Sequence, residues 1–417
     1  MSVRSYVVVV DAFATGALLA PAFRELGYGL IHLQTSNQMA KSLMRTFVPT
    51  DFDHCVDYES CGTERTLGIL RSLPIVCVLP GCDSGVILAD EIAESLGVAR
   101  NSAGTTLARR SKFFMHEALR ADGLLAARQI KSAKLEEVLI WYSAQDLRKV
   151  VVKPEYAARS EGVSFCESEN DVIRAFEMTV GTTNLFGIVN AELVVQEYLY
   201  GAEYMVNTMS VNGEHFVTDV WVGVDDDEEE ISADLYAELL HPEDEHFAAL
   251  SEYVKQVLTC VGIDTGPAHV EVRWTPGGAA LIEIGARLAG AMSSKAFRHA
   301  TGFDPVQLTV DAYVRPDRAL QALLLGGQSR CARLVFFHSD LGGLVHREPD
   351  LSEMYSLESV LDVLVMVRAG DLMQKTDDMS GRPGYAYLVH ETQSRLDEDY
   401  RRFRILENHL YRAMLGG

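Results

Sequence analysis

Residues 266–294 read GPAHVEVRWTPGGAALIEIGARLAGAMSS, and this stretch decides the fold. Two short apolar runs, Ala268–Trp274 and Ala279–Ile284, flank the four residues TPGG. Proline and glycine at those places predict a tight turn, so the stretch is expected to form a β-hairpin. Each arm carries one carboxylate in an otherwise apolar run, Glu271 on the first arm and Glu283 on the second.

The two carboxylates of this hairpin predict a metal site. A carboxylate in a half-buried strand is costly unless it is paired or binds a metal, and two on facing arms would repel each other. Since Mg²⁺ is commonly held by one or two carboxylates plus substrate phosphates, we interpret Glu271 and Glu283 as Mg²⁺ ligands, with Mn²⁺ as a substitute. Arg287, four residues after Glu283, is interpreted as a clamp for phosphate or carboxylate. On the hairpin alone, two solvent-facing glutamates on an edge hairpin are an equal alternative.

Composition limits the classes of partner. A chain of 417 residues exceeds one ordinary core, which predicts two or three domains or subdomains. It has 37 Lys and Arg residues against 59 Asp and Glu residues, and the resulting net charge of −22 argues against binding nucleic acid or an anionic membrane through bulk charge. A bound polyanion must therefore be held locally by a few cations.

The cysteines and the N-terminus indicate a cytoplasmic protein. The seven cysteines are odd in number and form no CxxC pair, which predicts reduced thiols and no zinc site. The four-valine run before Asp11 is too short for a signal sequence, and no apolar stretch reaches membrane-spanning length.

Residues 5–100 alternate predicted strands and helices, which predicts an open α/β sheet. No G-x-G-x-x-G motif occurs, so a dinucleotide site is not supported. Ligands of such sheets lie at the carboxyl ends of strands, here Asp11–Gly16 and Pro80–Gly85, and Ser84 is a candidate substrate contact for that reason. The predicted strands are Tyr6–Val10, Gly29–Leu33 and Ile75–Leu79, and a helix is predicted over Asp83–Leu96.

The rest of the chain is predicted to be mixed α and β. Residues 101–128 read as a helical linker, and the acidic run Asp225–Glu230 reads as a solvated loop. A boundary is predicted at Gly326-Gly327, followed by a small α+β segment with a helix near residues 352–359 and a closing helix from about 396. The other predicted elements are the strands Val150–Lys153, Val163–Cys166 and Leu193–Val195, the helix Asp171–Val180, the hairpin arms Glu203–Val211 and His215–Val224, an amphipathic helix over Phe247–Val261, and the late strands Ala332–His338, Leu361–Arg368 and Tyr385–His390.

The order of the polar residues along the chain resembles the ATP-grasp superfamily, over about residues 101–327. Each motif is weak alone, but the ordered set is strong. The set is Lys112 in a helix, Lys153 at a strand end, Ser160 and Gly162 in the following loop, Glu197-Tyr198-Leu199 after another strand, Glu203, Glu271, Glu283 and Arg287.

The resemblance implies an α/β and α+β fold of three parts. These are an N-terminal open α/β domain of residues 1–100, an ATP-grasp region of residues 101–328 and a small C-terminal α+β domain of residues 329–417. A lid of about residues 128–198 lies within the ATP-grasp region.

The resemblance implies that Lys112 and Lys153 contact the α- and β-phosphates of ATP, and that the loop with Ser160 and Gly162 covers them. Alone, a lysine such as Lys112 would more often be a solvated charge. The phosphate loop of the family is usually glycine-rich, and this chain departs from that pattern. Its residues 157–159 read AAR, so only Gly162 remains.

By the same resemblance, Glu197 and the backbone through Leu199 meet the adenine, and Glu203 meets the ribose. Tyr198 stands where an adenine wall is expected, although it could equally be an ordinary strand residue.

For the metal site, the resemblance implies that Glu271 and Glu283 bind Mg²⁺ and that Arg287 neutralises the γ-phosphate or the acyl phosphate. The second metal motif of the family is often Glu-x-Asn-x-Arg, whereas this chain has Gly285 in place of the Asn, which leaves the number of metal ions open. With His269 two residues before Glu271, the pattern is similar to the L-amino-acid ligases, which make dipeptides. His269 and His241 are the two weak candidates for a general base, and a histidine in an apolar strand is more often a packed core residue.

The small residues after Arg287 predict a substrate pocket. If that segment is helical, Ala291 lies one turn beyond Arg287, and it could face the same site together with Gly290. The alternative is that these small residues only let the segment pack closely on the sheet.

The predicted function is an ATP-dependent, ADP-forming ligase that joins two amino acids through an aminoacyl phosphate. Another ATP-grasp carboxylate–amine ligase, a carboxylase and a non-catalytic ATP-binding regulator remain as alternatives. The predicted partners are small amino-acid substrates, with neither nucleic acid nor membrane, and a homodimer is compatible with the sequence.

Overall fold

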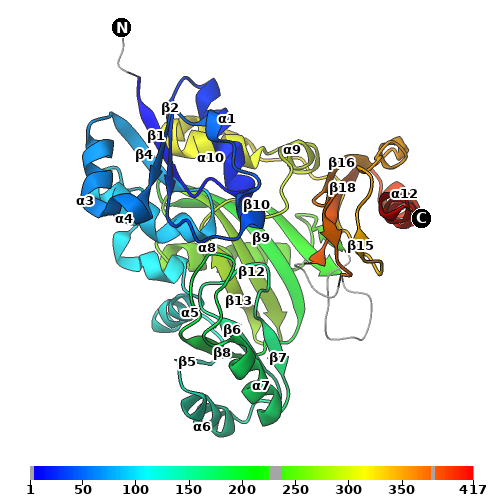
Figure 1. Cartoon of the computed structure of the whole chain (residues 1–417), viewed down its shortest axis with the longest axis horizontal. Helices are drawn as coiled ribbons and strands as arrows, with labels where there is room; N and C mark the ends of the chain where they lie inside the picture. The colour runs from blue at the N-terminus through cyan, green and yellow to red at the C-terminus, as the bar shows by residue number, and fades with distance from the viewer. Residues whose placement is uncertain (1–3, 225–235, 377–380, 417) are drawn as a thin grey trace.

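The protein is described by a computed structural model that covers residues 4–224, 236–376 and 381–416. In Figure 1 the lid projects from one end of a central sheet, and the N-terminal domain lies at the other end. The C-terminal strands extend that sheet to one side, and the last helix packs against them (Figure 1). The acidic run Asp225–Glu230 lies outside the described residues.

The N-terminal domain is a parallel sheet with the strand order β3-β2-β1-β4, as the open α/β prediction requires. Strand β1 lies in the interior of the sheet, between β2 and β4, and this position buries Val7, Val8, Val9 and Val10 completely. A continuous β-branched run favours such an interior strand. The strands are β1 Tyr6–Val10, β2 Gly29–Gln34, β3 His54–Asp57 and β4 Ile75–Pro80, and the helices are η1 Ala14–Leu18, α1 Leu19–Glu25, α2 Lys41–Met44, η2 Pro49–Asp51, α3 Tyr58–Arg71, η3 Asp83–Gly85 and α4 Val86–Ser95.

The predicted Asp83–Leu96 helix is thus a short 3₁₀ turn followed by α4. Strand β3 was not predicted, because it is a short edge strand with only Val56 buried and so shows no apolar run. The helix α3 that follows it was not predicted either.

The central sheet has eight strands in the order β13-β12-β9-β10-β11-β14-β18-β16. It runs across the predicted boundary at residue 328, because β11 pairs with β14, so strands on both sides of that boundary share one sheet. The domain limits themselves stay a prediction. The strands are β9 Ala202–Val211, β10 Glu214–Val224, β11 Tyr236–Leu239, β12 Gly266–Thr275, β13 Gly278–Gly285, β14 Cys331–Phe336, β16 Val360–Val365 and β18 Gly384–His390.

Helices pack around this sheet and connect it to the N-terminal domain. The predicted linker helix is the 3₁₀ helix η4 followed by α5, and it ends at Ala121 because Gly123 adopts a left-handed backbone with φ of 77°. The helices are η4 Ala103–Arg109, α5 Lys112–Ala121, α8 Phe247–Cys260, α9 Ser294–Thr301, α10 Pro305–Val314 and α11 Pro316–Leu325.

The lid is an antiparallel sheet with the order β5-β8-β6-β7, covered by two helices. Helix α7 begins with a capping box between Ser168 and Asp171, which explains its sharp start. The elements are β5 Gln129–Ser132, α6 Leu135–Gln145, β6 Val150–Pro154, β7 Ser164–Cys166, α7 Glu169–Thr179 and β8 Leu193–Glu197.

The C-terminal segment adds the small β15–β17 pair and a long closing helix. The helix predicted near 352–359 is wrong, since only the 3₁₀ turn η5 forms there and the chain already enters β16 at Val360. No helix among the described residues is long and apolar enough to cross a membrane. The elements are β15 Gly343–Leu344, η5 Met354–Ser356, β17 Leu372–Met373 and α12 Gln393–Leu415.

Candidate active site

The hairpin of β12 and β13 places its two carboxylates opposite each other. Glu271 pairs with Glu283 in the register, and a bulge directly after this pair leaves Ile282 without a partner. The Ile282 carbonyl accepts from His116 on α5, a fully buried histidine whose pKa burial lowers to about 3. The described residues contain no group of three or more His, Cys, Asp or Glu side chains arranged to hold a metal. Two facing carboxylates alone fit a Mg²⁺ that takes its remaining ligands from phosphate and water.

Lys112 connects the hairpin to the phosphate loop. Its Nζ lies 2.6 Å from Glu283 Oε1 and donates to the Ala157 carbonyl at 2.8 Å. Ser111 caps the helix by accepting from the Phe114 N–H, which fixes Lys112 at the first position of α5. The structure therefore brings Lys112, Glu283 and the loop together, as the ordered set predicts.

Lys153 lies at the end of β6 with only 6% of its surface exposed. Burial and the charge of Lys112 lower the pKa of Lys153 to about 8, although Glu283, Glu271 and Glu203 act in the opposite direction. Its ammonium group thus lies in the field of the two predicted metal ligands. A buried cation beside the metal pair is suited to hold a phosphate.

The loop after Lys153 turns tightly without being glycine-rich. Arg159, Ser160 and Gly162 all have left-handed backbones, with φ of 59°, 57° and 70°. A Cβ at Gly162 would lie 2.9 Å from the Pro154 ring, so glycine is required at this one position.

The predicted adenine and ribose residues carry ion pairs in the structure. Glu197 binds Arg128 through two parallel hydrogen bonds of 3.0 Å, and Glu203 lies 2.8 Å from Arg273. The carboxylate of Glu197 is thus already paired, and the predicted adenine contact is limited to the backbone that leads to Leu199. Tyr198 follows Glu197 in the chain and lies close to the second ion pair, because the Arg273 guanidinium carbon is 5.5 Å from the Tyr198 ring centroid.

Arg287 connects the metal hairpin to the N-terminal domain. Its Nε and one terminal nitrogen lie 3.0 and 2.9 Å from Asp83 Oδ2, and the other terminal nitrogen donates to the Leu288 carbonyl. Burial favours the neutral acid, but the guanidinium groups of Arg287 and Arg110 lower the pKa of Asp83 below its ordinary value. Two of the five N–H groups of Arg287 remain for a substrate oxygen.

The strand ends β1 and β4 lie beside this ion pair. Ser84 donates to Asp11 at 2.6 Å, and Asp11 also accepts from the backbone and hydroxyl of Thr35. Gly16 and Gly81 allow these two loops to touch, because a Cβ at Gly16 would collide with the Gly81 backbone. The Ser84 hydroxyl therefore already donates its proton to Asp11, and only its oxygen could accept a hydrogen bond from a substrate.

His269 lies in a polar network behind the metal pair. Its Nδ1 lies 2.8 Å from Asn207 Oδ1, and its Nε2 lies 3.6 Å from Glu271. Asn207 in turn donates to the buried carboxylate of Asp219 at 2.5 Å. The structure thus places His269 next to Glu271, a predicted metal ligand, and the role of His269 as a base stays a prediction. His241 lies after β11 with an exposed side chain near Glu243.

The segment after Arg287 is not helical, which corrects the expected helical turn. It is a loop up to Ser293, and Ala291 has a left-handed backbone with φ of 46°, which a helix excludes. The Ala291 carbonyl accepts from the Tyr387 hydroxyl at 2.7 Å, which holds the loop on the sheet. A Cβ at Gly290 would meet no atom within 4 Å, so Gly290 borders open space.

Sequence reasoning missed four charged residues of the site: Asp83, Arg110, Arg128 and Arg273. Asp83 lies in a loop already identified as a ligand-binding strand end, and Arg110 precedes Lys112 by two residues, so both had a usable positional signal. Arg128 and Arg273 had none.

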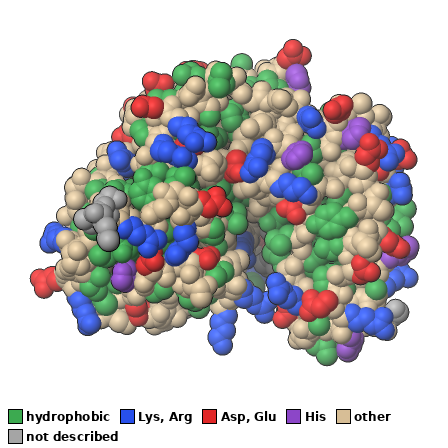
Figure 2. All heavy atoms as spheres, turned by 90° about the horizontal axis from the view of Figure 1, so that it is seen from above, with side chains coloured by type: hydrophobic (Ala, Val, Ile, Leu, Met, Phe, Trp, Pro, Cys, Tyr) green, Lys and Arg blue, Asp and Glu red, His purple; other side chains and the backbone are tan. Residues whose placement is uncertain are grey.

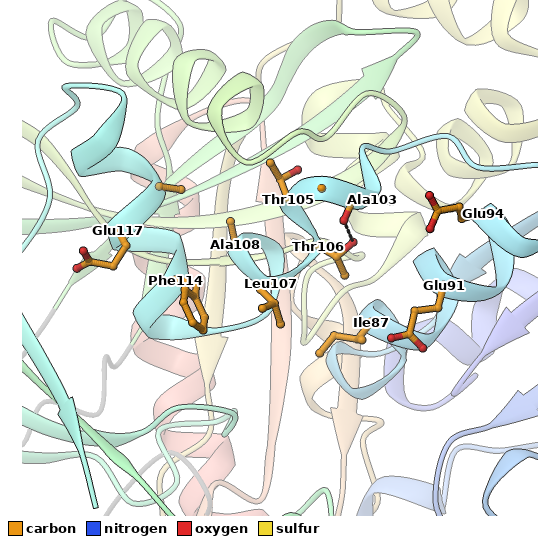
Figure 3. Close-up of a pocket in the computed structure, with 12 residues that line it drawn as sticks. Ile87, Glu91, Glu94, Ala103, Thr105, Thr106, Leu107, Ala108, Phe114 and Glu117 are labelled. Atoms are coloured by element: carbon orange, nitrogen blue, oxygen red, sulfur yellow. Dashed lines mark hydrogen bonds between the residues drawn. The ribbon is translucent and has the colours of Figure 1, made fainter. Parts of the chain in front are cut away.

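Two hollows bear on where ligands bind. Figure 2 shows one face of the molecule hollowed near its middle, with Lys and Arg side chains along one rim. A separate pocket of about 690 Å³ lies between α4, η4 and α5 (Figure 3). None of the predicted site residues lines that pocket, and its wall carries Glu91, Glu94 and Glu117, which do not suit an anionic nucleotide.

The chain is similar to known proteins of the ATP-grasp family. Residues 148–295 match the model of a family described as ATP-grasp domain. The chain is 28% identical over 424 residues to dapdiamide A synthase of Enterobacter agglomerans, which covers 98% of this chain and 97% of that protein.

Two solved structures share the fold. The L-amino acid ligase from Bacillus licheniformis matches with a TM-score of 0.76 at 17% identity, over 96% of this chain and 97% of that one. The biotin carboxylase domain dimer of Hydrogenobacter thermophilus 2-oxoglutarate carboxylase, in complex with MgADP, ADP and bicarbonate, matches with a TM-score of 0.65 at 13% identity, over 95% and 88%. The ATP-grasp fold predicted from the sequence is confirmed.

Proposed function

Because the chain belongs to the ATP-grasp carbon–nitrogen ligases, we propose that it joins two amino acids into a dipeptide through an aminoacyl phosphate, with release of ADP. One observation carries the proposal. The facing pair Glu271 and Glu283 lies beside Lys112, and Arg287 ties the same hairpin to the strand ends of the N-terminal domain at Asp83. Phosphate-binding cations and a possible amino-acid site therefore meet at one place.

The proposed reaction has two steps. A carboxylate oxygen of the first amino acid attacks the γ-phosphorus of ATP in line, the bond to the β,γ-bridging oxygen breaks, and ADP leaves. The amine of the second amino acid then attacks the acyl carbon, phosphate departs, and the amine loses a proton as the amide forms.

The residues divide the work between them. Lys112 and Lys153 hold phosphate oxygens, and Arg287 directs its remaining N–H groups at the oxygens that gain negative charge. Glu271 and Glu283 would hold Mg²⁺, which neutralises phosphate charge when bound. The lid, which docks on the N-terminal domain, excludes water from the acyl phosphate.

Amino-acid substrates are favoured over bicarbonate, because the chain is 28% identical to dapdiamide A synthase over nearly its whole length and matches the L-amino acid ligase with a TM-score of 0.76, against 13% identity and a TM-score of 0.65 for the biotin carboxylase domain. A product of the peptide-antibiotic or phytotoxin kind fits this reading. The rival is another ATP-grasp carboxylate–amine ligase or a carboxylase, since a biotin carboxylase domain shares the fold. The intact set of Lys153, Glu271, Glu283 and Arg287 disfavours a non-catalytic regulator.

The deciding experiment is a screen of ADP and phosphate release over pairs of amino acids with ATP and Mg²⁺. We expect release to require an amino-acid carboxylate, to rise with an amine acceptor and to give ADP. Turnover that depends on bicarbonate, or that gives AMP and pyrophosphate, would place the protein in another reaction class. Tight ATP binding without turnover for any pair would favour the regulator.

A further inference from the structure

Arg110 is a buried cation in the seam between the lid and the N-terminal domain. It follows η4 directly, and only 6% of its surface is exposed. Its guanidinium carbon lies 5.3 Å from the ring centroid of Tyr156 and 5.2 Å from that of Phe186, both of which belong to the lid. One terminal nitrogen donates to the Tyr156 carbonyl at 3.0 Å. The two rings and this bond hold the guanidinium in one orientation.

This cation differs from most other buried cations in having no carboxylate partner. Among the described residues, neither Arg110 nor Lys153 has a carboxylate oxygen within 4.0 Å. A buried cation with no carboxylate in contact is costly, even with Asp83 in its wider field, and an anionic ligand that binds it lowers that cost. The nucleotide phosphates supply the anion for Lys153. The buried cations with ion-pair partners are Arg109 with Asp90, Lys112 with Glu283, Lys149 with Glu167 and Arg333 with Glu238.

Arg110 faces the place where the reaction is proposed to occur. The carboxylate of Asp83 lies in the fields of both Arg287 and Arg110. Phe186, which stacks on Arg110, belongs to the same buried apolar cluster as Phe13 and Cys82, the residue before Asp83. Arg110 therefore lies close to the strand ends of β1 and β4, on the side that the lid covers.

An inventory of negative charges identifies the missing anion. In the proposed reaction Lys112, Lys153 and the metal bind the phosphates, and Arg287 binds the reacting carboxylate. The one anion left is the α-carboxylate of the second amino acid, which does not react. A guanidinium matches a carboxylate with two parallel hydrogen bonds. Resting on the proposed function, we propose that Arg110 binds the α-carboxylate of the amine-donating amino acid and so selects amino acids over simple amines.

The test compares acceptors with and without that carboxylate. ADP release is measured with a fixed first amino acid and either a free amino acid or its α-carboxamide as acceptor, for the wild type and for Arg110→Gln and Arg110→Lys. We expect the wild type to prefer the free acid. Arg110→Gln should raise the KM for the acid about tenfold or more and leave the KM for the amide unchanged. Arg110→Lys, which keeps the charge but loses the fork, should lie between them.

Two controls separate this inference from a structural role and from the proposed function. The KM values for ATP and for the first amino acid should hold in both variants, and Arg120→Gln, at the exposed end of α5, should leave every value unchanged. Equal use of acid and amide by the wild type, or a parallel rise of all KM values in Arg110→Gln, overturns the inference while dipeptide formation stands. Absence of wild-type turnover with every pair overturns the proposed function, and this inference with it.

Discussion

At the scale of single residues, the site depends on charges that the fold holds close together. Lys153 shows this directly, because it is buried beside the metal pair without an ion-pair partner among the described residues. Lys153→Ala removes a charge-assisted contact to phosphate worth roughly 1.5–3 kcal/mol. We expect the affinity for an ATP analogue, measured by calorimetry, to fall about tenfold or more. An unchanged affinity would remove Lys153 from the nucleotide site.

The depressed pKa of Lys153 also predicts how binding depends on pH. Burial lowers the pKa of Lys153 to about 8 in the folded protein, against the ordinary lysine pKa of 10.5 expected in the unfolded chain. Between these values the unfolded chain holds more protons, so this group makes the free protein more stable as pH rises. Phosphate needs the protonated amine, so MgADP affinity should fall as pH rises through about 8. Lys153→Arg should flatten that dependence, and an equal pH dependence in both proteins would contradict the assignment.

Glu283 joins the metal pair to Lys112, so its charge serves both. Glu283→Gln keeps the shape of the side chain but removes the charge that would hold Mg²⁺. We expect near-complete loss of ADP release by a protein that still folds but melts at a lower temperature, because the change leaves the buried Lys112 without its ion-pair partner. Glu214→Gln, at the exposed start of β10, is the matched control and should keep full activity. Wild-type-like turnover of Glu283→Gln in Mg²⁺ would reduce Glu283 to a surface residue.

Among the elements, the loop between α7 and β8 joins the lid to the N-terminal domain. The Leu185 carbonyl accepts from the Ala40 N–H at 2.8 Å, and Phe186 is 3% exposed in a cluster with Phe13, Met39 and Leu43 of the N-terminal domain. This cluster closes the seam over the strand ends of β1 and β4. Apolar contacts outside the lid's own core therefore hold the lid against the N-terminal domain.

Phe186→Ala should loosen the lid and admit water. Truncation of a buried phenylalanine costs about 3–5 kcal/mol, and here the cost falls on the docked state of the lid. We expect more phosphate released per amide bond, because water then competes with the amine for the acyl phosphate. Met178→Ala, on the exposed face of α7, is the control for the lid. An unchanged ratio of phosphate to dipeptide in Phe186→Ala would mean that another part of the chain excludes water.

At the scale of the whole molecule, the eight-stranded sheet makes the C-terminal strands a continuation of the ATP-grasp region. Arg333 fastens this junction from β14, with ion pairs to Glu238 on β11 and, at 2.8 Å, to Asp397 on α12. Its guanidinium carbon lies 4.1 Å from the ring centroid of Tyr236 and 4.6 Å from that of Tyr400. The two regions should therefore unfold together.

Arg333→Met tests that coupling. The change removes a buried cation together with its ion pairs and its contacts to Tyr236 and Tyr400, so we expect a loss of about 1–3 kcal/mol in the free energy of unfolding. Denaturant unfolding followed by circular dichroism should show one transition at lower denaturant, and Arg401→Met on the exposed face of α12 should not shift it. Two separate transitions in the wild type would instead mean that the parts fold independently.

Sequence patterns alone predicted most of the strands and an ordered set of candidate site residues. The valine run gave β1 its interior position, and TPGG set the hairpin that aligns Glu271 with Glu283, because strand pattern and turn chemistry act over a few residues. The order of lysines and glutamates then led to the ATP-grasp fold. Local patterns carry no such signal for a short edge strand such as β3 or for the loop at Ala291, whose left-handed backbone is held by Tyr387.

Only the tertiary structure decided which charges meet. Arg287 and Asp83 are 204 residues apart in the chain, and Lys112 and Glu283 are 171 apart. Their pairing depends on how the N-terminal domain, the lid and the central sheet pack, which no local pattern encodes. The same packing buries Arg110 between two lid rings without a carboxylate partner among the described residues. An unpaired charge is a property of its whole surroundings, and for that reason the sequence could not reveal it.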